Sequence, residues 1–261
     1  MIIIPDIHGR DFWKEAVKGR ESEKIIFLGD YVDPYPAEGI APEKGMQTLI
    51  EVIEFKKKHM ENVVLLLGNH DLSYVSNYLP KCRHDYVNHH IICSLLKENM
   101  PLFDIVHEAY VSDIRILFSH AGILPDWLDD NVSIIGKIEP GDEARHLNHM
   151  FHDDHIYAAL GDVSPFRGGH VKHGSCVWAD IDEFIGIGNN IPGWNLIVPH
   201  DEPFPVPNNP SMLPDCFQVF GHTQLKAPIT TDWFAGLDCH KAFTLDDAFV
   251  FTPIEPTATQ S

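Results

Sequence analysis

The chain has 261 residues and a formal net charge of −19. A chain this acidic is not expected to bind nucleic acid or anionic membranes nonspecifically, because phosphate-rich surfaces attract clustered Lys and Arg. It contains five cysteines, an odd number with no close pair, which disfavours a disulfide framework or a thiolate zinc site. No signal-peptide pattern or membrane-spanning apolar run is visible, so we expect a cytoplasmic protein.

Strands and helices are expected to alternate in the first half of the chain. The apolar runs at residues 1–5, 25–28 and 63–67 are typical of buried strands. Helices are expected at residues 11–18, 43–59 and 84–96; in the second of these, apolar side chains recur at helical spacing. This alternation indicates an α/β chain, which some classification schemes place in the α+β class.

A hairpin is expected in the middle of the chain, and the carboxyl-terminal third is expected to contain mostly strands. Residues 105–111 and 114–118 flank Ser112-Asp113 and predict a hairpin. Further strands are expected at 217–220, 233–237, 242–245 and 248–252. We expect one domain over residues 1–253 with an insertion at about 125–216, and a disordered tail at 254–261. Within the insertion, residues 141–160 read as helical and 187–214 as a long loop, which can act as a substrate-selecting lid.

Five short polar segments each follow one of the strand-like runs. They are Asp6-Ile7-His8-Gly9, Gly29-Asp30-Tyr31-Val32-Asp33, Gly68-Asn69-His70-Asp71, Ser119-His120-Ala121-Gly122 and Gly221-His222-Thr223. Open α/β sheets place their ligands at the carboxyl ends of strands, so we expect the five segments to converge on one site.

The side chains in these segments predict a metal centre. Carboxylate, imidazole and amide ligands without cysteine suit Mn, Fe, Zn or Mg. Six such ligands exceed what one ion needs if water also binds, so two ions bridged by one carboxylate are expected. A pair of ions about 3.5–4 Å apart lowers the pKa of a bridging water and favours in-line displacement at phosphorus. The sequence therefore predicts phosphoester hydrolysis.

The five motifs in this order resemble those of the calcineurin-like metallophosphoesterases, most closely the phosphoprotein phosphatase branch that also includes bacterial diadenosine tetraphosphatases. The resemblance implies a four-layer α/β/β/α sandwich of two mixed sheets flanked by helices. It also implies two metal ions, Mn²⁺ and/or Fe, with Zn or Mg as alternatives. By this resemblance, Asp6, His8 and His222 hold one ion, Asp30 bridges, and Asn69 and His120 hold the second. In the family a further histidine normally completes the ligand shell of the second ion, and His173 or His170 is the expected candidate.

The resemblance also implies a catalytic pair. His70 matches the general acid that protonates the leaving oxygen, and Asp33 matches the carboxylate that favours its imidazolium form. The alternative is that His70 only caps a helix beginning at Asp71. The helical histidines 146, 149, 152 and 155 recur every third residue, so a third metal site is a weaker hypothesis than a solvated face.

One departure from the family pattern concerns substrate binding. Asp33 is followed by Pro34-Tyr35-Pro36, where the family usually has Arg-Gly and the arginine binds phosphate. Arg167, beside Gly168-Gly169, is the expected replacement; Arg10 is the second candidate and Arg83 a weaker third. Asn69 is also expected near the substrate.

Several functional alternatives remain open at this point. A serine/threonine protein phosphatase and a dinucleoside polyphosphate hydrolase both fit, with a phosphorylated small molecule, nucleotide or phosphoprotein as substrate. The segment Leu237-Asp238-Cys239-His240 has histidine where nucleotide-cleaving relatives have glycine, which argues against a shared substrate. A catalytically silent, metal-stabilised interaction module is the alternative outside enzymes, and the oligomeric state is left open.

Overall fold

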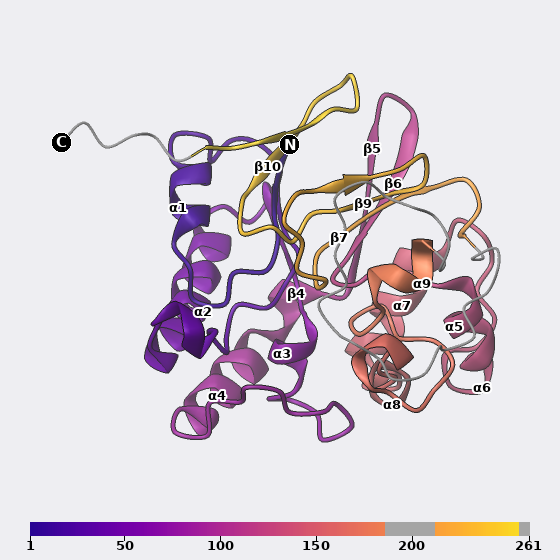
Figure 1. Cartoon of the computed structure of the whole chain (residues 1–261), viewed down its shortest axis with the longest axis horizontal. Helices are drawn as coiled ribbons and strands as arrows, with labels where there is room; N and C mark the ends of the chain where they lie inside the picture. Colours follow the sequence, from indigo (N-terminus) through magenta and orange to yellow (C-terminus); the bar gives the residue numbers. More distant parts are fainter. Residues whose placement is uncertain (186–211, 256–261) are drawn as a thin grey trace.

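The computed structural model of the chain describes residues 1–185 and 212–255. Two mixed β-sheets pack face to face, with helices on their outer sides (Figure 1). The α/β fold class and the two helix-flanked mixed sheets predicted from the sequence are confirmed.

The first sheet has the strand order β11-β10-β1-β2-β3-β4. Strands β1 to β4 are parallel to one another, and β10 pairs antiparallel with β1. The bounds of these strands are β1 Ile2–Ile4, β2 Ile25–Phe27, β3 Val63–Leu66, β4 Phe103–Asp104, β10 Phe243–Leu245 and β11 Phe251–Pro253.

The second sheet has the order β5-β6-β7-β9-β8. Its central strands β6, β7 and β9 are parallel, while β5 and β8 are antiparallel edges. Their bounds are β5 Val106–Val111, β6 Ile114–Ser119, β7 Phe217–Phe220, β8 Ile229–Thr230 and β9 Phe234–Gly236. Three parallel strands of the first sheet and two of the second therefore end near the same edge of the sandwich.

Alternation along the strands divides the apolar core. In β1, Ile2 and Ile4 belong to the larger cluster that includes helix residues, while Ile3 belongs to a second cluster. That second cluster lies between the sheets, since it combines Ile3 with residues of the other sheet such as Phe118 and Val219. Side chains on successive strand residues point to opposite faces, so each buried strand serves both clusters.

The α-helices flank the two sheets. Helices α1, α2 and α4 lie beside the first sheet, and α5 to α9 belong to the insertion after β6 (Figure 1). Their bounds are α1 Phe12–Val17, α2 Pro42–Lys58, α3 Asn69–Leu72, α4 His89–Asn99, α5 Pro125–Asp130, α6 Val132–Ile135, α7 Glu143–His152, α8 Tyr157–Leu160 and α9 Ile181–Ile185.

Most predicted elements are found within a few residues of their expected bounds, with two differences at their ends. The helix expected to begin at residue 84 begins at His89, because Asp85 Oδ1 accepts the backbone N–H groups of Val87 and Asn88 at 3.0 Å and forms a turn there. The last strand begins at Phe251 and not at 248, where Asp246 Oδ1 accepts N–H groups in a turn. The loop expected at 187–214 and the tail at 254–261 fall largely outside the described residues.

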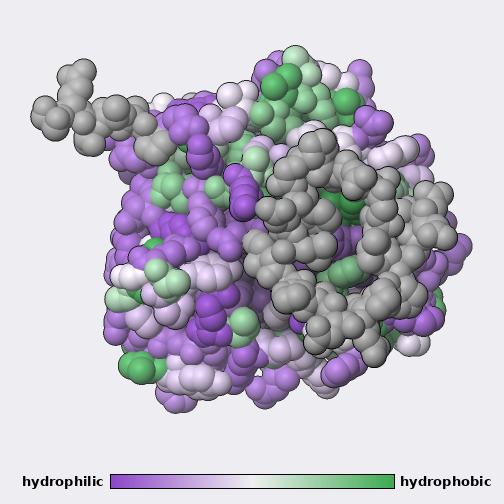
Figure 2. Space-filling view, in the orientation of Figure 1, coloured by the Kyte–Doolittle hydropathy of each residue, from purple (hydrophilic) through white to green (hydrophobic). Residues whose placement is uncertain are grey.

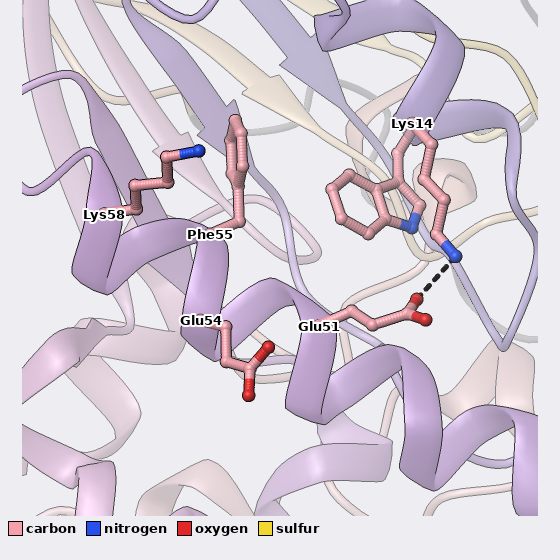
Figure 3. A pocket seen from close by; sticks show the side chains of 6 residues that line it. Lys14, Glu51, Glu54, Phe55 and Lys58 are labelled. Atoms are coloured by element: carbon pink, nitrogen blue, oxygen red, sulfur yellow. Dashed lines mark ion pairs between the residues drawn. The ribbon is translucent and has the colours of Figure 1, made fainter.

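The surface adds two observations. Hydrophilic residues cover much of the face shown in Figure 2, and a green apolar group lies at the end where the β-hairpins project. A hollow between α1 and α2 is lined by Trp13, Lys14, Glu51, Glu54, Phe55 and Lys58 (Figure 3). None of these six residues was expected in the active site. Among the described residues, no helix has the length and apolar character needed to cross a membrane.

Candidate active site

The five polar segments predicted from the sequence meet at the carboxyl ends of β1, β2, β3, β6 and β7. Contacts between their side chains join both sheets; for example, His120 after β6 contacts Asn69 after β3. Every one of the converging side chains is at most 7 % exposed. They are Asp6, His8, Asp30, Asp33, Asn69, His70, His120 and His222.

Four of these side chains form one compact group of possible metal ligands. His120 Nε2 lies 3.0 Å from Asn69 Oδ1, 3.1 Å from His222 Nδ1 and 3.5 Å from Asp30 Oδ2. The group places His222 with His120, whereas the family resemblance implies that His222 joins Asp6 and His8 at the other ion. Asn69, His120 and His222 thus lie around Asp30.

A second group shares the Asp30 carboxylate. His8 Nε2 lies 3.4 Å from Asp30 Oδ2. A ring nitrogen of His70 lies within 4.8 Å of the ligand atoms of both side chains, close enough to share a metal ion with them. Asp6 is tied to the first group, because its Oδ1 atom accepts the backbone N–H of His222 at 3.0 Å. Because Asp30 belongs to both groups, its position is that of a bridging ligand.

The hydrogen bonds at Nδ1 of His8 and His120 leave both side chains suited to bind metal ions through Nε2. His8 Nδ1 lies 2.7 Å from the carbonyl oxygen of Val32, and His120 Nδ1 lies 2.9 Å from that of Leu28. A hydrogen bond donated by Nδ1 leaves a lone pair on Nε2, which is the usual arrangement of a metal-binding histidine. Burial lowers the pKa of both rings, which favours the neutral form that can bind metal. The donor set of carboxylate, imidazole and amide suits divalent cations of the Mn, Fe, Zn and Mg kind.

The backbone of the site adopts conformations that most residues avoid. His8, Asp30, Asp33 and His222 have φ values of 46°, 54°, 55° and 63°. Left-handed backbone at such residues is costly and concentrates at functional sites, where the surrounding fold maintains it.

Two glycines allow the carboxylates to approach the backbone closely. A Cβ atom at Gly68 would lie 2.1 Å from Asp30 Oδ1, and one at Gly221 would lie 2.2 Å from Asp6 Oδ1. Any larger residue at either position would displace a candidate ligand. Glycine is therefore required here for space.

Asp71 is a structural part of the site that was not singled out from the sequence. Its carboxylate accepts the backbone N–H groups of Asp30 at 2.7 Å, Gly68 at 3.0 Å and Tyr31 at 3.0 Å. Asp71 thus fixes the segment after β2 to the segment after β3. Its position next to His70 was the available signal, but which backbone groups it would reach depends on the tertiary fold.

His70 and Asp33 form the pair expected of a general acid and its carboxylate. His70 Nδ1 lies 2.8 Å from Asp33 Oδ2, and the Tyr74 hydroxyl donates to Asp33 Oδ1 at 2.5 Å. Helix α3 begins at Asn69, so His70 lies inside the helix and does not cap one that begins at Asp71. Tyr74 is a second residue not identified from the sequence.

The surroundings of this pair favour the neutral form of both side chains. Burial raises the pKa of Asp33 to about 6, while burial and then the Arg83 guanidinium lower the pKa of His70 well below its usual value. The carboxylate alone therefore does not ensure a protonated His70. An anion bound beside the ring would favour the imidazolium form.

Three arginines surround the site, and each has different partners. Arg10 is paired in bidentate fashion with Glu38, at 2.8 and 2.6 Å. Arg167 pairs with Asp180 at 2.9 Å and donates to Thr223 Oγ1 at 3.0 Å. The third, Arg83, points its Nη2 atom at the rings of His70 and His8, at 3.1 and 3.4 Å.

Two histidine hypotheses are not supported by position. His173 lies beside helix α5, with Nδ1 3.0 Å from Asp130 Oδ2, and is absent from both ligand groups; His170 is exposed. The helical histidines also diverge: His146 contacts the carbonyl of Ile135, and His152 contacts Asp104. Among the residues that the structure describes, the two groups around Asp30 are the clusters of His, Cys, Asp or Glu with metal-ligand spacing.

Two further residues lie against the site. The Trp178 ring packs edge-on against His222, with centroids 5.6 Å apart. Asp238 is buried, and its Oδ1 has no hydrogen-bond partner among the described residues. Burial, followed by the nearby Asp6 carboxylate, raises the Asp238 pKa well above its usual value.

Comparison with known proteins agrees with this geometry. Residues 1–223 match the calcineurin-like phosphoesterase family, so the chain belongs to that family. Among its relatives, a Caenorhabditis elegans protein named "Putative serine/threonine-protein phosphatase C06A1.3" is 25% identical over 173 residues. This match covers 62% of the chain but 44% of the relative, so the chain spans less than half of that protein's length.

One solved structure has a similar fold. A point mutant of a cold-active protein tyrosine phosphatase aligns over 97% of this chain and 80% of its own, with a TM-score of 0.51 and 10% identity. At this identity the likeness concerns the fold alone. The phosphatase domain of the Legionella effector WipB aligns over 56% of this chain and 58% of its own, with 13% identity and a TM-score of 0.31.

Proposed function

We propose that the protein is a metal-dependent phosphoesterase that hydrolyses a phosphate ester or anhydride. The observation that carries this proposal is the hydrogen bond between His70 and Asp33 at two ligand groups that share Asp30, with the His70 ring itself within ligand distance of His8 and Asp30. Membership of the calcineurin-like phosphoesterase family supports it. A serine/threonine phosphoprotein or a dinucleoside polyphosphate is the substrate class that the sequence left open.

The proposed metal ligands divide between two ions. Asp6, His8 and Asp30 would hold one ion, and Asp30, Asn69, His120 and His222 the other. Mn²⁺ or Fe fits this donor set best, with Zn and Mg as alternatives. When bound, such ions supply positive charge that polarises a phosphoryl group and lowers the pKa of water.

The remaining side chains have roles that follow from their contacts. The ring nitrogen Nδ1 of His70 is held by Asp33, so Nε2, which faces Arg83 Nη2 at 3.1 Å, is the ring atom that would give a proton to the leaving oxygen. The Tyr74 hydroxyl fixes the other oxygen of Asp33 and prevents the carboxylate from rotating away. Asn69 and one of the arginines would orient the phosphate for in-line attack.

Reconstitution of the purified protein tests the proposal. Chelator-stripped protein would be loaded separately with Mn²⁺, Fe²⁺, Zn²⁺ or Mg²⁺ and offered p-nitrophenyl phosphate, a phosphoserine peptide and diadenosine tetraphosphate. We expect two ions per chain by elemental analysis and turnover that depends on them. A folded protein that binds two ions but hydrolyses none of the three substrates would instead be a metal-stabilised interaction module.

A further inference from the structure

Arg83 carries a positive charge into the site without a carboxylate to neutralise it. Among the described residues its guanidinium forms no ion pair. Its contacts are the carbonyl oxygen of Asp33 at 3.4 Å, the Tyr35 ring, and the Nε2 atoms of His70 and His8. None of these partners is a carboxylate, so none of them supplies a negative charge.

Arg10 and Arg167 differ from Arg83 in this respect. Each is within 3 Å of a carboxylate oxygen, of Glu38 and Asp180 respectively. A guanidinium already paired with a carboxylate gains less from a phosphate, because the existing pair must be weakened or broken. Arg83 is therefore the arginine best prepared for an incoming anion.

Tyr35 holds Arg83 in this position. The carbon atom at the centre of the guanidinium lies 3.6 Å from the centroid of the Tyr35 ring, within the range of a cation–π contact. The Tyr35 ring also meets the His8 ring edge-on, with centroids 5.0 Å apart. The ring thus places the cation beside a candidate metal ligand without neutralising it.

The backbone around Arg83 is also fixed to the site. Arg83 has a left-handed φ of 49°, and the next two residues, His84 and Asp85, are buried. The backbone N–H of Asp85 lies 2.8 Å from the Tyr74 hydroxyl and 3.2 Å from Asp33 Oδ1. The loop that carries Arg83 is therefore attached to the same carboxylate that holds His70.

We propose that Arg83, positioned by Tyr35, binds a terminal phosphate group and makes the site selective for such groups. This inference rests on the proposed phosphoesterase function. The substrates would be phosphomonoesters and terminal phosphoanhydrides, in preference to phosphodiesters and to the internal anhydrides of dinucleoside polyphosphates. Tyr35, which lies between Pro34 and Pro36, then provides an aromatic ring that supports Arg83, a residue about fifty positions later in the chain.

The chemistry of phosphate explains this selectivity. A terminal phosphate has three non-bridging oxygens and up to two negative charges, whereas a diester or an internal phosphate has two such oxygens and one charge. The site offers a phosphate two sets of binding partners: the ions that the groups around Asp30 would hold, and Arg83 Nη2 with His70 Nε2. A terminal phosphate can engage both sets, and an unneutralised guanidinium favours the more highly charged group.

Phosphate binding gives a test that does not depend on turnover. Inorganic phosphate would be titrated calorimetrically into metal-loaded wild type, Arg83→Gln, Arg83→Lys, Arg167→Gln and a surface control, Arg145→Gln, whose side chain is 83% exposed. We expect Arg83→Gln to weaken binding by about 10- to 100-fold, with Arg83→Lys intermediate and Arg145→Gln unchanged. Unchanged binding in Arg83→Gln, or loss in Arg167→Gln alone, would overturn the assignment.

Variants of Tyr35 test its positioning role. Tyr35→Phe keeps the ring and should bind phosphate like wild type, while Tyr35→Leu should bind about 3- to 10-fold more weakly. Equal effects of the two replacements would show that the ring does not position Arg83. Metal content measured on every variant separates this effect from damage to the neighbouring His8.

Hydrolysis then tests the selectivity. Wild type should cleave p-nitrophenyl phosphate with a kcat/KM well above that for bis-p-nitrophenyl phosphate or diadenosine tetraphosphate, and Arg83→Gln should reduce this ratio. A wild type that prefers the diester or the dinucleotide contradicts the inference but leaves phosphoesterase function intact. Absence of all hydrolysis, with phosphate binding that still depends on Arg83, contradicts the proposed function instead.

Discussion

His70 donates its backbone N–H to Asp30 Oδ1 at 3.0 Å, so the candidate general acid and the candidate bridging ligand are fixed to each other. The same Asp30 carboxylate presents Oδ2 to His8 and His120, at 3.4 and 3.5 Å. One oxygen thus orients the segment that bears His70, while the other faces the ligand groups. This one side chain therefore links the candidate acid to the candidate metal ligands.

We expect Asp30→Asn to remove metal from both groups and to abolish nearly all hydrolysis. A bridging carboxylate offsets the charge of two cations, which a neutral amide cannot do. Elemental analysis of the purified variant measures the loss. Asp130→Asn, which changes a carboxylate outside the site, is the control and should keep its metal; two ions retained in Asp30→Asn would rule out the bridging role.

The placement of His222 with His120 predicts which histidine affects the second ion. His222→Ala should lower the metal content by about one ion per chain, because its Nδ1 lies in the group with Asn69 and His120. His173→Ala should leave metal content unchanged, since His173 pairs with Asp130 of α5. The reverse result would mean that His173 completes the shell, as the sequence comparison suggested.

We expect His70→Asn to lower kcat by roughly 10²- to 10⁴-fold with metal content retained, as for loss of a general acid. The loss should depend on the leaving group. p-Nitrophenolate needs little protonation, so its release should suffer much less than that of a serine alkoxide from a phosphopeptide. Equal losses on the two substrates would argue against proton donation by His70, and Asp33→Asn should show the same leaving-group dependence in weaker form.

Gly68→Ala should displace Asp30 and reduce metal binding, because the new Cβ would lie 2.1 Å from Asp30 Oδ1. Gly141→Ala is the control for replacing a glycine: no atom lies within 4 Å of its added Cβ, although its φ of 92° strains an alanine. Gly141→Ala should therefore lose roughly 1 kcal/mol of stability or more through backbone strain and keep its metal. Comparable metal content in the two variants would contradict the steric argument.

His107 on β5 should contribute to loss of stability in acid. Burial lowers its pKa to about 4. Between pH 6.5 and 4 the unfolded chain therefore binds a proton that the folded chain does not, so the free energy of unfolding falls as the pH falls. His107→Phe should remove up to about 3 kcal/mol of this fall, measured as the difference between urea unfolding at about pH 7 and about pH 4.5. The exposed His90→Phe is the control, and identical pH dependence in wild type and His107→Phe would contradict the prediction.

The sequence by itself determined the fold class and the composition of the site. Buried runs such as 63–67 are short, apolar and bounded by polar or glycine residues, so local patterning predicts their strands. The polar residues that follow these strands include all the proposed ligands from Asp6 to His222. Their convergence was also predictable, because carboxyl ends of parallel strands meet at one edge of a sheet. Ends of elements such as α4 were less predictable, since a side chain like Asp85 can replace the first turn of a helix.

Only the tertiary structure decided which ligand belongs to which group and which arginine reaches the rings. His222 lies beside His120 because β6 and β7 are neighbours in the second sheet, a pairing that the sequence does not specify. Arg83 reaches His70 because its loop is attached to Asp33 and its guanidinium stacks on Tyr35, across a separation of about fifty residues. Such contacts depend on loop paths and side-chain packing between distant segments, and these carry no periodic signal in the sequence.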